Sequence, residues 1–255
     1  MSELLIISSS PSDFEMLKTL TQEISKKQKV DLLCLFKPNS NDLKSLRNKN
    51  INLKIENLNL TYKTENNEFL NKDLIKVNRF ISSFLSESKY KLFLILGDRY
   101  ELLPVAQQIY LNKKILIHLH GGEVTQGSWD DSIRHSISKL SHIHFVSSKK
   151  AKENLISMGE QSRNIFNYGS LGASNAKDIN ILNKESLFKE LNLNTESKSC
   201  LLVVQPITNS EFNMTKNMNI VVNFLVGNNF NQILISNVNT DPGSKEIINY
   251  FKNIK

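Results

Sequence analysis

The sequence is poor in the residues that mark secreted, metal-bound or membrane proteins. Its 255 residues include two cysteines, five prolines and one tryptophan. Cys34 and Cys200 each lie in an apolar run, which is typical of buried reduced thiols and not of a disulfide framework. The N-terminus lacks a basic segment followed by a long apolar stretch, and no run reaches the roughly 18 apolar residues that a membrane span requires. These absences predict a cytoplasmic protein without a membrane segment.

Several familiar glycine-rich signatures are missing as well. No Gly-x-Gly-x-x-Gly follows the first apolar run, and neither a P-loop nor a Gly-x-Ser-x-Gly elbow occurs. The net charge of +7 suits an anionic ligand. The lysines are scattered among asparagines without a dense basic run, so nucleic acid is not predicted as a partner.

Short apolar runs alternate with helical patterns through the first two thirds of the chain. This alternation predicts an open, doubly wound parallel sheet with helices on both faces. The expected strands are residues 4–7, 30–36, 53–58, 90–96, 115–120, 142–147 and 165–168. The expected helices are residues 14–24, 69–85, 101–110, 129–140 and 149–158. Ligands bind such sheets beyond the carboxyl ends of the strands, which places residues 8–13, 97–101, 120–126 and 147 along one edge.

The last third predicts a second and smaller α/β unit. Residues 169–178 are small and polar, as in an interdomain linker. Helices are expected at 186–191, 217–226 and 245–254, strands at 201–205 and 232–236, and a turn at 241–244. Two strands make a thin sheet for an independent domain. We therefore predict an N-terminal Rossmann-like domain at 1–172 and an incomplete C-terminal one at 173–255.

Ionisable residues are densest at 97–147, which contains all five histidines: His118, His120, His135, His142 and His144. By strand alternation, His118 and His120 are expected to share one face of the sheet, as are His142 and His144. A His-x-His pair can ligate zinc or iron, but no third ligand stands at a familiar spacing. Packed or edge histidines are the favoured interpretation, and we predict no metal and no cofactor.

Two carboxylates follow expected strands in this region. Asp98 comes after one strand and before a helix, where it can cap the helix or act as a general base. Glu123 follows Gly121 and Gly122, which either make a tight loop or let a ligand approach the backbone. Spacing alone leaves both alternatives open.

The segment Asp-Asp-Ser-Ile-Arg-His at 130–135 opens an expected helix. On that helix, Asp130 is an i,i+4 neighbour of Arg134, and Asp131 is an i,i+4 neighbour of His135. Two exposed ion pairs are one interpretation. The other is a site, because four ionisable residues stand in the first turns, where an anion is also favoured.

The order of these motifs resembles one enzyme family. GDRYE at 97–101, followed by HLHGGEVTQGSWDDSIRHSISKLSHIHFVS at 118–147, is similar to the UDP-N-acetylglucosamine 2-epimerase family, in its hydrolysing branch of sialic and nonulosonic acid pathways. A weaker similarity continues to residue 246. The resemblance implies two Rossmann-like domains of GT-B type, a UDP-sugar as the ligand, and commonly a homodimer. The expected reaction converts UDP-N-acetylglucosamine to UDP and N-acetylmannosamine through loss of the C2 proton and of UDP.

The resemblance also implies roles for individual residues. Asp98, Glu123 and Asp130 match the acidic catalytic residues, and Arg134 matches the active-site arginine. The accompanying positions, expected to contact substrate, are Arg99, Asp131 and His135.

Three departures stand beside this match. Pro11, Ser12 and Asp13 occupy a turn where the family usually carries an arginine, and Gln205 stands in Gln-Pro-Ile-Thr where the family has a catalytic histidine. Glutamine cannot transfer a proton near neutral pH. The Gly/Ser-rich segment expected to hold the diphosphate would lie beyond Lys255, so the sequence is expected to be either a fragment or split product, or a decayed relative. An active hydrolysing epimerase is therefore weighed against an inactive sugar-nucleotide- or partner-binding relative, and a GT-B glycosyltransferase shares the fold but not these motifs.

Overall fold

The computed structural model describes residues 3–62, 67–176, 180–206, 214–238 and 243–254. The chain divides into two compact units, one formed by residues 1–61 and 68–178 and the other by residues 62–67 and 179–255. The predicted boundary between residues 172 and 173 falls inside a short helix of the first unit, α7 (Leu171–Ala176). The expected linker therefore contains regular structure, because Leu171 packs against the core of the first unit.

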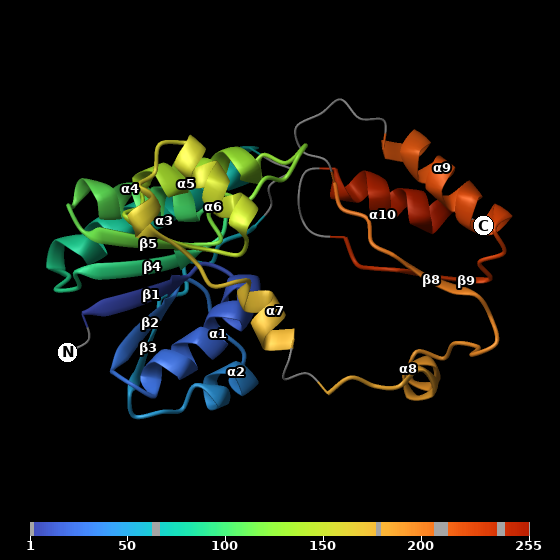
Figure 1. Ribbon diagram of the computed structural model, residues 1–255, viewed down its shortest axis with the longest axis horizontal. Helices are drawn as coiled ribbons and strands as arrows, with labels where there is room; N and C mark the ends of the chain where they lie inside the picture. Colours follow the sequence, from blue (N-terminus) through green and yellow to red (C-terminus); the bar gives the residue numbers. More distant parts are fainter. Residues whose placement is uncertain (1–2, 63–66, 177–179, 207–213, 239–242, 255) are drawn as a thin grey trace. The chain divides into compact units, whose positions relative to one another are not determined.

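The first unit is built on one seven-stranded sheet of order β3-β2-β1-β4-β5-β6-β7 (Figure 1). Its strands are β1 Leu4–Ser8, β2 Val30–Cys34, β3 Ile51–Ile55, β4 Leu92–Leu96, β5 Ile115–Leu119, β6 Ile143–Val146 and β7 Ile165–Asn167. All neighbouring strands are parallel, so their carboxyl ends lie at one edge. The strand order reverses between β1 and β4, and this is the position where doubly wound sheets bind ligands.

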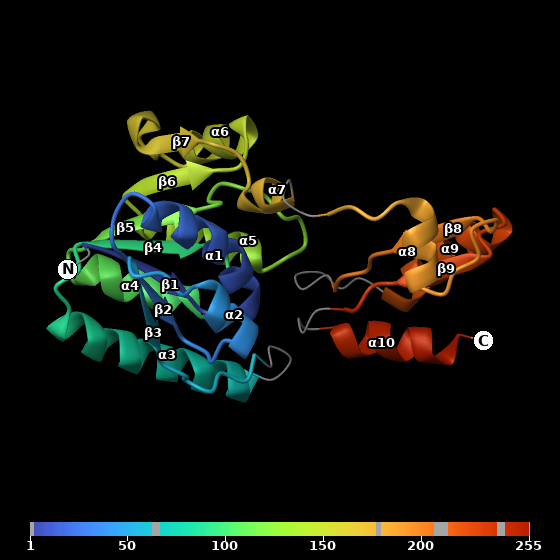
Figure 2. The same ribbon diagram turned by 90° about the horizontal axis from the view of Figure 1, so that it is seen from below.

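Helices cover both faces of this sheet, as the alternating pattern predicted (Figures 1 and 2). They are α1 Pro11–Ser25, α2 Ser40–Ser45, α3 Asn67–Glu87, α4 Leu102–Leu111, α5 Asp130–Leu140, α6 Lys149–Ser157 and α7, with a 3-10 turn at Ser162–Asn164. One core packs α3, α4 and α5 against β1, β2, β4 and β5. A second core packs α1 against the opposite face. The helix α2 was missed in the sequence because its six residues carry no apolar periodicity.

The second unit is smaller and less buried. It contains α8 Lys184–Glu190, β8 Ser199–Leu202, α9 Met214–Gly227, β9 Gln232–Ile235 and α10 Ser244–Asn253, with β8 and β9 forming a parallel two-stranded sheet. Met214, Met218 and Ile247 form its core. Cys34 is buried as predicted, but Cys200 on β8 is partly exposed, so that prediction was wrong. The expected turn at 241–244 lies largely outside the described residues.

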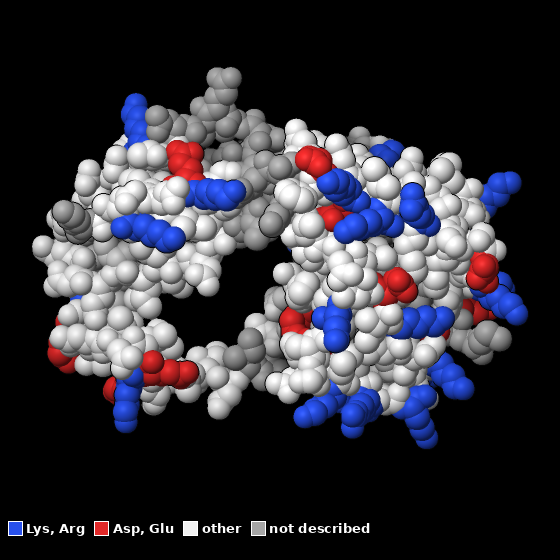
Figure 3. Space-filling view, turned by 180° about the vertical axis from the view of Figure 1, so that it is seen from behind, with Lys and Arg blue, Asp and Glu red and all other residues white. Residues whose placement is uncertain are grey.

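The surface carries mixed charge. Figure 3 shows Lys and Arg side chains scattered singly and in small groups, with Asp and Glu among them, over the face in view. Within the part of the chain that the structure describes, no helix has the length and apolar character needed to cross a bilayer.

Candidate active site

Loops from three neighbouring strands meet at the carboxyl edge of the first unit. Gly97 follows β4 with φ +87°, and its N–H donates to the Leu119 carbonyl at 3.0 Å. His120 follows β5, and its N–H donates to the Phe145 carbonyl at 2.9 Å. Backbone hydrogen bonds thus connect the ends of β4, β5 and β6. Asp98 and Glu123 lie in the loops that follow β4 and β5.

Arg134 is the centre of this cluster. Its side chain, on the second turn of α5, is only 5% exposed and forms an ion pair with Asp98. The guanidinium also donates to the Glu123 carbonyl at 2.9 Å and to Thr125 Oγ1 at 3.1 Å, and pairs with Asp131 at 3.2 Å. One buried cation therefore joins α5 to the loops after β4 and β5. Charge-assisted contacts of this kind are the strong hydrogen bonds of proteins.

The pairing along α5 differs from the predicted one. Arg134 pairs with Asp131 at i,i+3, and Asp130 accepts from Ser128 Oγ at 2.9 Å. Asp131 Oδ2 lies 3.6 Å from His135 Nε2, so the second predicted i,i+4 pair forms. Asp130 is the first residue of the helix, with Trp129 at the N-cap. The Ser128 hydroxyl therefore contacts the Asp130 carboxylate at the start of the helix.

Asp98 does not cap the following helix. Helix α4 begins at Leu102, with Glu101 at the N-cap and no side-chain capping bond. The carboxylate of Asp98 instead contacts Arg134, and its side chain keeps 30% exposure. The capping interpretation was therefore wrong, and Asp98 is a partly exposed carboxylate held beside a buried cation.

The Gly-Gly loop carries Glu123 between two helices. A Cβ added at Gly122 would lie 2.3 Å from the Ala151 carbonyl on α6, so this backbone approaches α6 more closely than a side chain allows. Asn154 of the same helix donates to the Gly122 carbonyl at 2.8 Å. The Glu123 carboxylate accepts from the hydroxyl of Ser147, the residue that follows β6. The loop is tight, and it also holds Glu123 in a fixed position at the edge.

Two further carboxylates lie beneath this edge, and the sequence did not single out either as a site residue. Glu101 is fully buried and pairs with Arg99, and Asp13 is buried at the start of α1. Burial raises the pKa of both carboxyls, and the positive charge of Arg99 opposes that rise. Asp13 accepts from Ser9 Oγ at 2.6 Å. Where the family resemblance led us to expect an arginine turn, this chain has a buried carboxyl close to Arg99.

His118 and His120 do not share a face, contrary to the prediction. His118 is buried, and its Nδ1 lies 3.1 Å from Ser138 Oγ on α5. His120 has φ +62°, so the backbone turns left-handed after β5 and breaks the strand alternation. Its Nε2 accepts from the Leu171 N–H at 3.2 Å on the other side of the sheet. Burial lowers the pKa of His120, and the negative charges of Glu123 and Asp98 oppose that effect.

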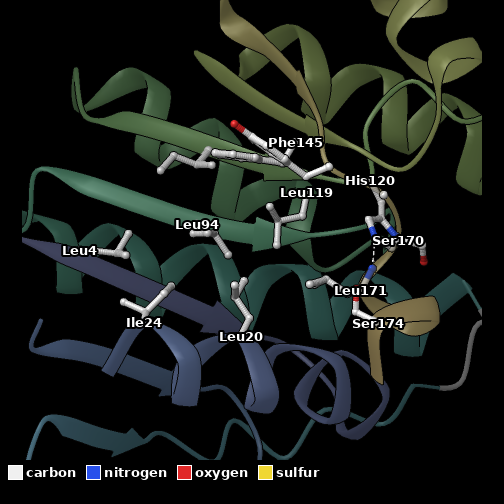
Figure 4. A pocket seen from close by; sticks show the side chains of 13 residues that line it. Leu4, Leu20, Ile24, Leu94, Leu119, His120, Phe145, Ser170, Leu171 and Ser174 are labelled. Atoms are coloured by element: carbon white, nitrogen blue, oxygen red, sulfur yellow. Dashed lines mark hydrogen bonds between the residues drawn. The ribbon is translucent and has the colours of Figure 1, made fainter. Parts of the chain in front are cut away.

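An apolar cavity of about 420 Å³ lies on the sheet face opposite to α5 (Figure 4). Leu20 and Ile24 of α1, Leu119 of β5 and Phe145 of β6 line it. His120 stands at one end, next to Leu171 (Figure 4). The cavity thus lies on the face opposite to α5, and His120 at its end is close enough to Glu123 and Asp98 for their charges to act on its ring.

The other residues that the sequence singled out do not join the cluster around Arg134. His142 precedes β6, and His144 lies buried 3.4 Å from Glu160. Among the described residues, no three His, Cys, Asp or Glu side chains gather as metal ligands do. Gln205 is an exposed residue of the second unit, after β8. Ile207 and Thr208 of its motif lie outside the described residues.

Comparison with known proteins decides the family. The profile of the UDP-N-acetylglucosamine 2-epimerase family matches residues 11–255. The chain belongs to the UDP-N-acetylglucosamine 2-epimerase family. Among curated relatives, it is 45% identical over 127 residues to the GDP/UDP-N,N'-diacetylbacillosamine 2-epimerase (hydrolyzing) of Campylobacter jejuni, covering 50% of this chain and 33% of that protein. It is 32% identical over 194 residues to the polysialic acid biosynthesis protein P7 of Escherichia coli, covering 73% and 49%.

A solved structure of the family shares the fold. The UDP-GlcNAc 2-epimerase from Neisseria meningitidis, bound to UDP-GlcNAc, aligns with a TM-score of 0.71 at 15% identity, over 99% of this chain and 70% of that one. The fold class of this epimerase-family chain is therefore α/β of the GT-B type, as predicted. The chain spans between a third and a half of the length of the two curated relatives.

Proposed function

We propose that this chain carries the carboxylate half of a hydrolysing 2-epimerase for UDP-2-acetamido sugars. The proposed reaction converts UDP-N-acetylglucosamine and water to UDP and N-acetylmannosamine. The observation that carries the proposal is the buried Arg134, which holds Asp98 and the Glu123 loop together at the carboxyl edge. A buried cation with several partners holds their carboxylates and loops in one geometry, which catalysis requires. An ion pair that served only the surface would not need to be buried.

The proposed chemistry needs an acid, a base and stabilisation of charge. A carboxylate takes the C2 proton while the bond between C1 and the UDP oxygen breaks, which leaves a 2-acetamidoglucal. Water then adds, its hydroxyl to C1 and a proton to the opposite face of C2. Asp98, Glu123 and Asp130 are the proposed acid and base groups, and Arg134 is proposed to position Asp98 as the charge changes.

The names of relatives support the choice of substrate class. The protein of Campylobacter jejuni is named for GDP- or UDP-linked diacetylbacillosamine, and that of Legionella pneumophila for the UDP-linked sugar. The protein of Neisseria meningitidis is named for UDP-N-acetylglucosamine. Both donors share UDP and a 2-acetamido group, and UDP-N-acetylglucosamine is our proposed substrate. A homodimer remains a prediction from the family resemblance.

Incubation of the purified full chain with each of the two UDP-sugars tests the proposal. Proton NMR is expected to show UDP and the free 2-epimer accumulating in equal amounts, with solvent deuterium incorporated at C2 in D2O. A folded chain that releases no UDP from either sugar would overturn the proposed activity. UDP release without inversion or deuterium at C2 would indicate simple hydrolysis and would contradict the elimination route.

Gln205 offers a second test because glutamine cannot transfer protons. If the family histidine assists the reaction, Gln205→His is expected to raise kcat by about 100-fold or more, the usual contribution of an acid or base group. Gln205→Asn is the control, since it also lacks a titratable group. Equal rates in all three chains would show that position 205 takes no part in proton transfer.

A further inference from the structure

His118 lies where the three site segments meet. It is a fully buried residue of β5 whose ring faces α5. Its Nε2 is 2.7 Å from the carbonyl of Gly97, the residue before Asp98. Its Nδ1 is 3.1 Å from Ser138 Oγ, one helical turn after Arg134. The ring therefore links the backbone that carries Asp98 to the helix that carries its cationic partner.

The chemistry of the two partners fixes the state of this ring. A carbonyl can only accept, so Nε2 must carry the proton and donate to Gly97. Nδ1 then accepts from the Ser138 hydroxyl. Burial lowers the pKa of His118 to about 3, helped by the charges of His144, Arg134 and His120 and opposed by the Gly97 carbonyl. The ring stays neutral over the physiological range, so both hydrogen bonds keep their direction.

The third site segment rests on the same pair of side chains. A Cβ added at Gly121 would lie 2.8 Å from Ser138 Oγ and 2.9 Å from His118 Nδ1. The Gly-Gly loop that delivers Glu123 therefore touches the point where His118 and Ser138 meet. Displacement of the His118 ring would therefore shift the loops after β4 and β5 and the contact with α5.

We propose that His118 is a positioning residue, which fixes Asp98 against Arg134 through a bridge from the Gly97 carbonyl to the Ser138 hydroxyl. This role rests on the proposed function of the cluster. His118 is not expected to touch the substrate, because it is buried under α5. Its effect on the reaction is expected to come through the geometry of Asp98.

Substitutions separate positioning from stability. His118→Leu removes both hydrogen bonds and is expected to lower kcat about 100-fold with little change in KM, the size of effect that a misplacement of about 1 Å produces. His118→Gln keeps an amide N–H near the Nε2 position and is expected to recover most of that loss. Ser138→Ala removes only the second bond and is expected to lower kcat severalfold.

His144 provides a matched control. It pairs in register with His118 on the neighbouring strand and is equally buried, but its ring lies next to Glu160 and not next to a site loop. His144→Leu is expected to destabilise the fold while the folded protein keeps its kcat. Equal losses of kcat in His118→Leu and His144→Leu, or full activity in His118→Leu, would overturn the bridge.

Two measurements do not depend on activity and so separate this proposal from the proposed function. Nitrogen-15 NMR of the histidine rings in the full chain is expected to show His118 protonated at Nε2 and not titrating between pH 5 and 8. The Gly97 amide donates to the Leu119 carbonyl, and its hydrogen exchange is expected to accelerate in His118→Leu and not in His144→Leu. A titrating ring, an Nδ1–H tautomer or unchanged exchange at Gly97 would overturn the bridge even in an active enzyme. If the wild-type chain is inactive, the proposed function fails and these two measurements still decide the bridge.

Discussion

The two units of the chain bury their strands to very different extents. Every residue of β1 and β2 in the first unit is buried, whereas no residue of β8 or β9 in the second unit is. The first sheet has helices on both faces, and the second has two strands. A fixed arrangement of charged groups needs supporting side chains that cannot move. The comparison explains why the carboxylate cluster can be held entirely within the first unit.

The largest effect is expected at Arg134, which joins three elements of the first unit. Arg134→Leu leaves Asp98 and Asp131 close together without their cation. We expect activity to fall about 1,000-fold and the free energy of unfolding to fall by roughly 3 kcal/mol, as when one partner of a buried pair is removed. Product release by NMR and urea denaturation measure the two effects. Arg163→Leu, at an exposed arginine of the same unit, is the control. Near-wild-type activity in Arg134→Leu would show that the first unit does not hold the site.

Asp98 and Asp131 both contact Arg134 but differ in proposed role. Asp98→Asn removes a proposed acid or base group and is expected to lower kcat by about 100-fold or more. Asp131→Asn removes a neighbour of the guanidinium and is expected to have a smaller effect, mainly on KM. Steady-state kinetics with UDP-N-acetylglucosamine measure both variants. The reverse order of effects would assign the acid or base role to Asp131 in place of Asp98.

Much of the first unit could be predicted from its sequence because buried parallel strands are continuous apolar runs. Each run before Asp98, Glu123 and Ser147 became a strand that ends at the predicted edge. The parallel topology then brought together residues 24 or more positions apart, such as Glu123 and Ser147. The sheet and its carboxyl edge therefore followed from the apolar runs and the helical patterns between them.

The predictions that were wrong depend on the backbone torsions of one residue and on the residue at which a helix begins. His120 was assigned to the face of His118 because strands alternate, but its left-handed backbone reverses that direction. Asp130 was assigned to Arg134 by helical spacing, but the helix begins at Asp130 and Asp131 makes the contact. The backbone torsion at His120 and the residue at which α5 begins depend on contacts in the folded protein. A pattern of residue types along the sequence does not contain these contacts.

The buried carboxyl of Glu101 predicts a pH effect confined to the first unit. Its pKa is raised above the ordinary 4.5 mainly by burial, so the folded protein binds this proton more tightly than the unfolded chain. The resulting stabilisation is complete below about pH 4.5 and is lost as pH rises through the folded pKa. Glu101→Gln cannot ionise, so its free energy of unfolding should improve relative to wild type as pH rises. The difference is on the order of 1.4 kcal/mol for each pKa unit.

Urea denaturation at several pH values from 4 to 7 measures this difference. Glu68→Gln is a control of opposite sign, because the hydrogen bond from Lys72 lowers the pKa of Glu68. Glu68→Gln lacks that exposed carboxylate, so its free energy of unfolding should fall relative to wild type as pH rises. Parallel curves for Glu101→Gln and wild type would show that Glu101 is ionised equally in both states.

The smallest expected change in stability concerns the apolar surface of the second unit. Phe224 of α9 is 63% exposed, and Ile75 of α3 in the first unit is similarly exposed at 60%. Substitution of either by serine should change the free energy of unfolding by no more than about 0.5 kcal/mol. The two should differ in binding of an apolar dye, since Leu201, Val203, Ile220 and Val226 of the second unit are also at least 60% exposed. Phe224→Ser should lower dye fluorescence more than Ile75→Ser does. Equal dye binding in both variants would mean that exposed apolar side chains do not distinguish the second unit, and the contrast between the two units would then rest on strand burial alone.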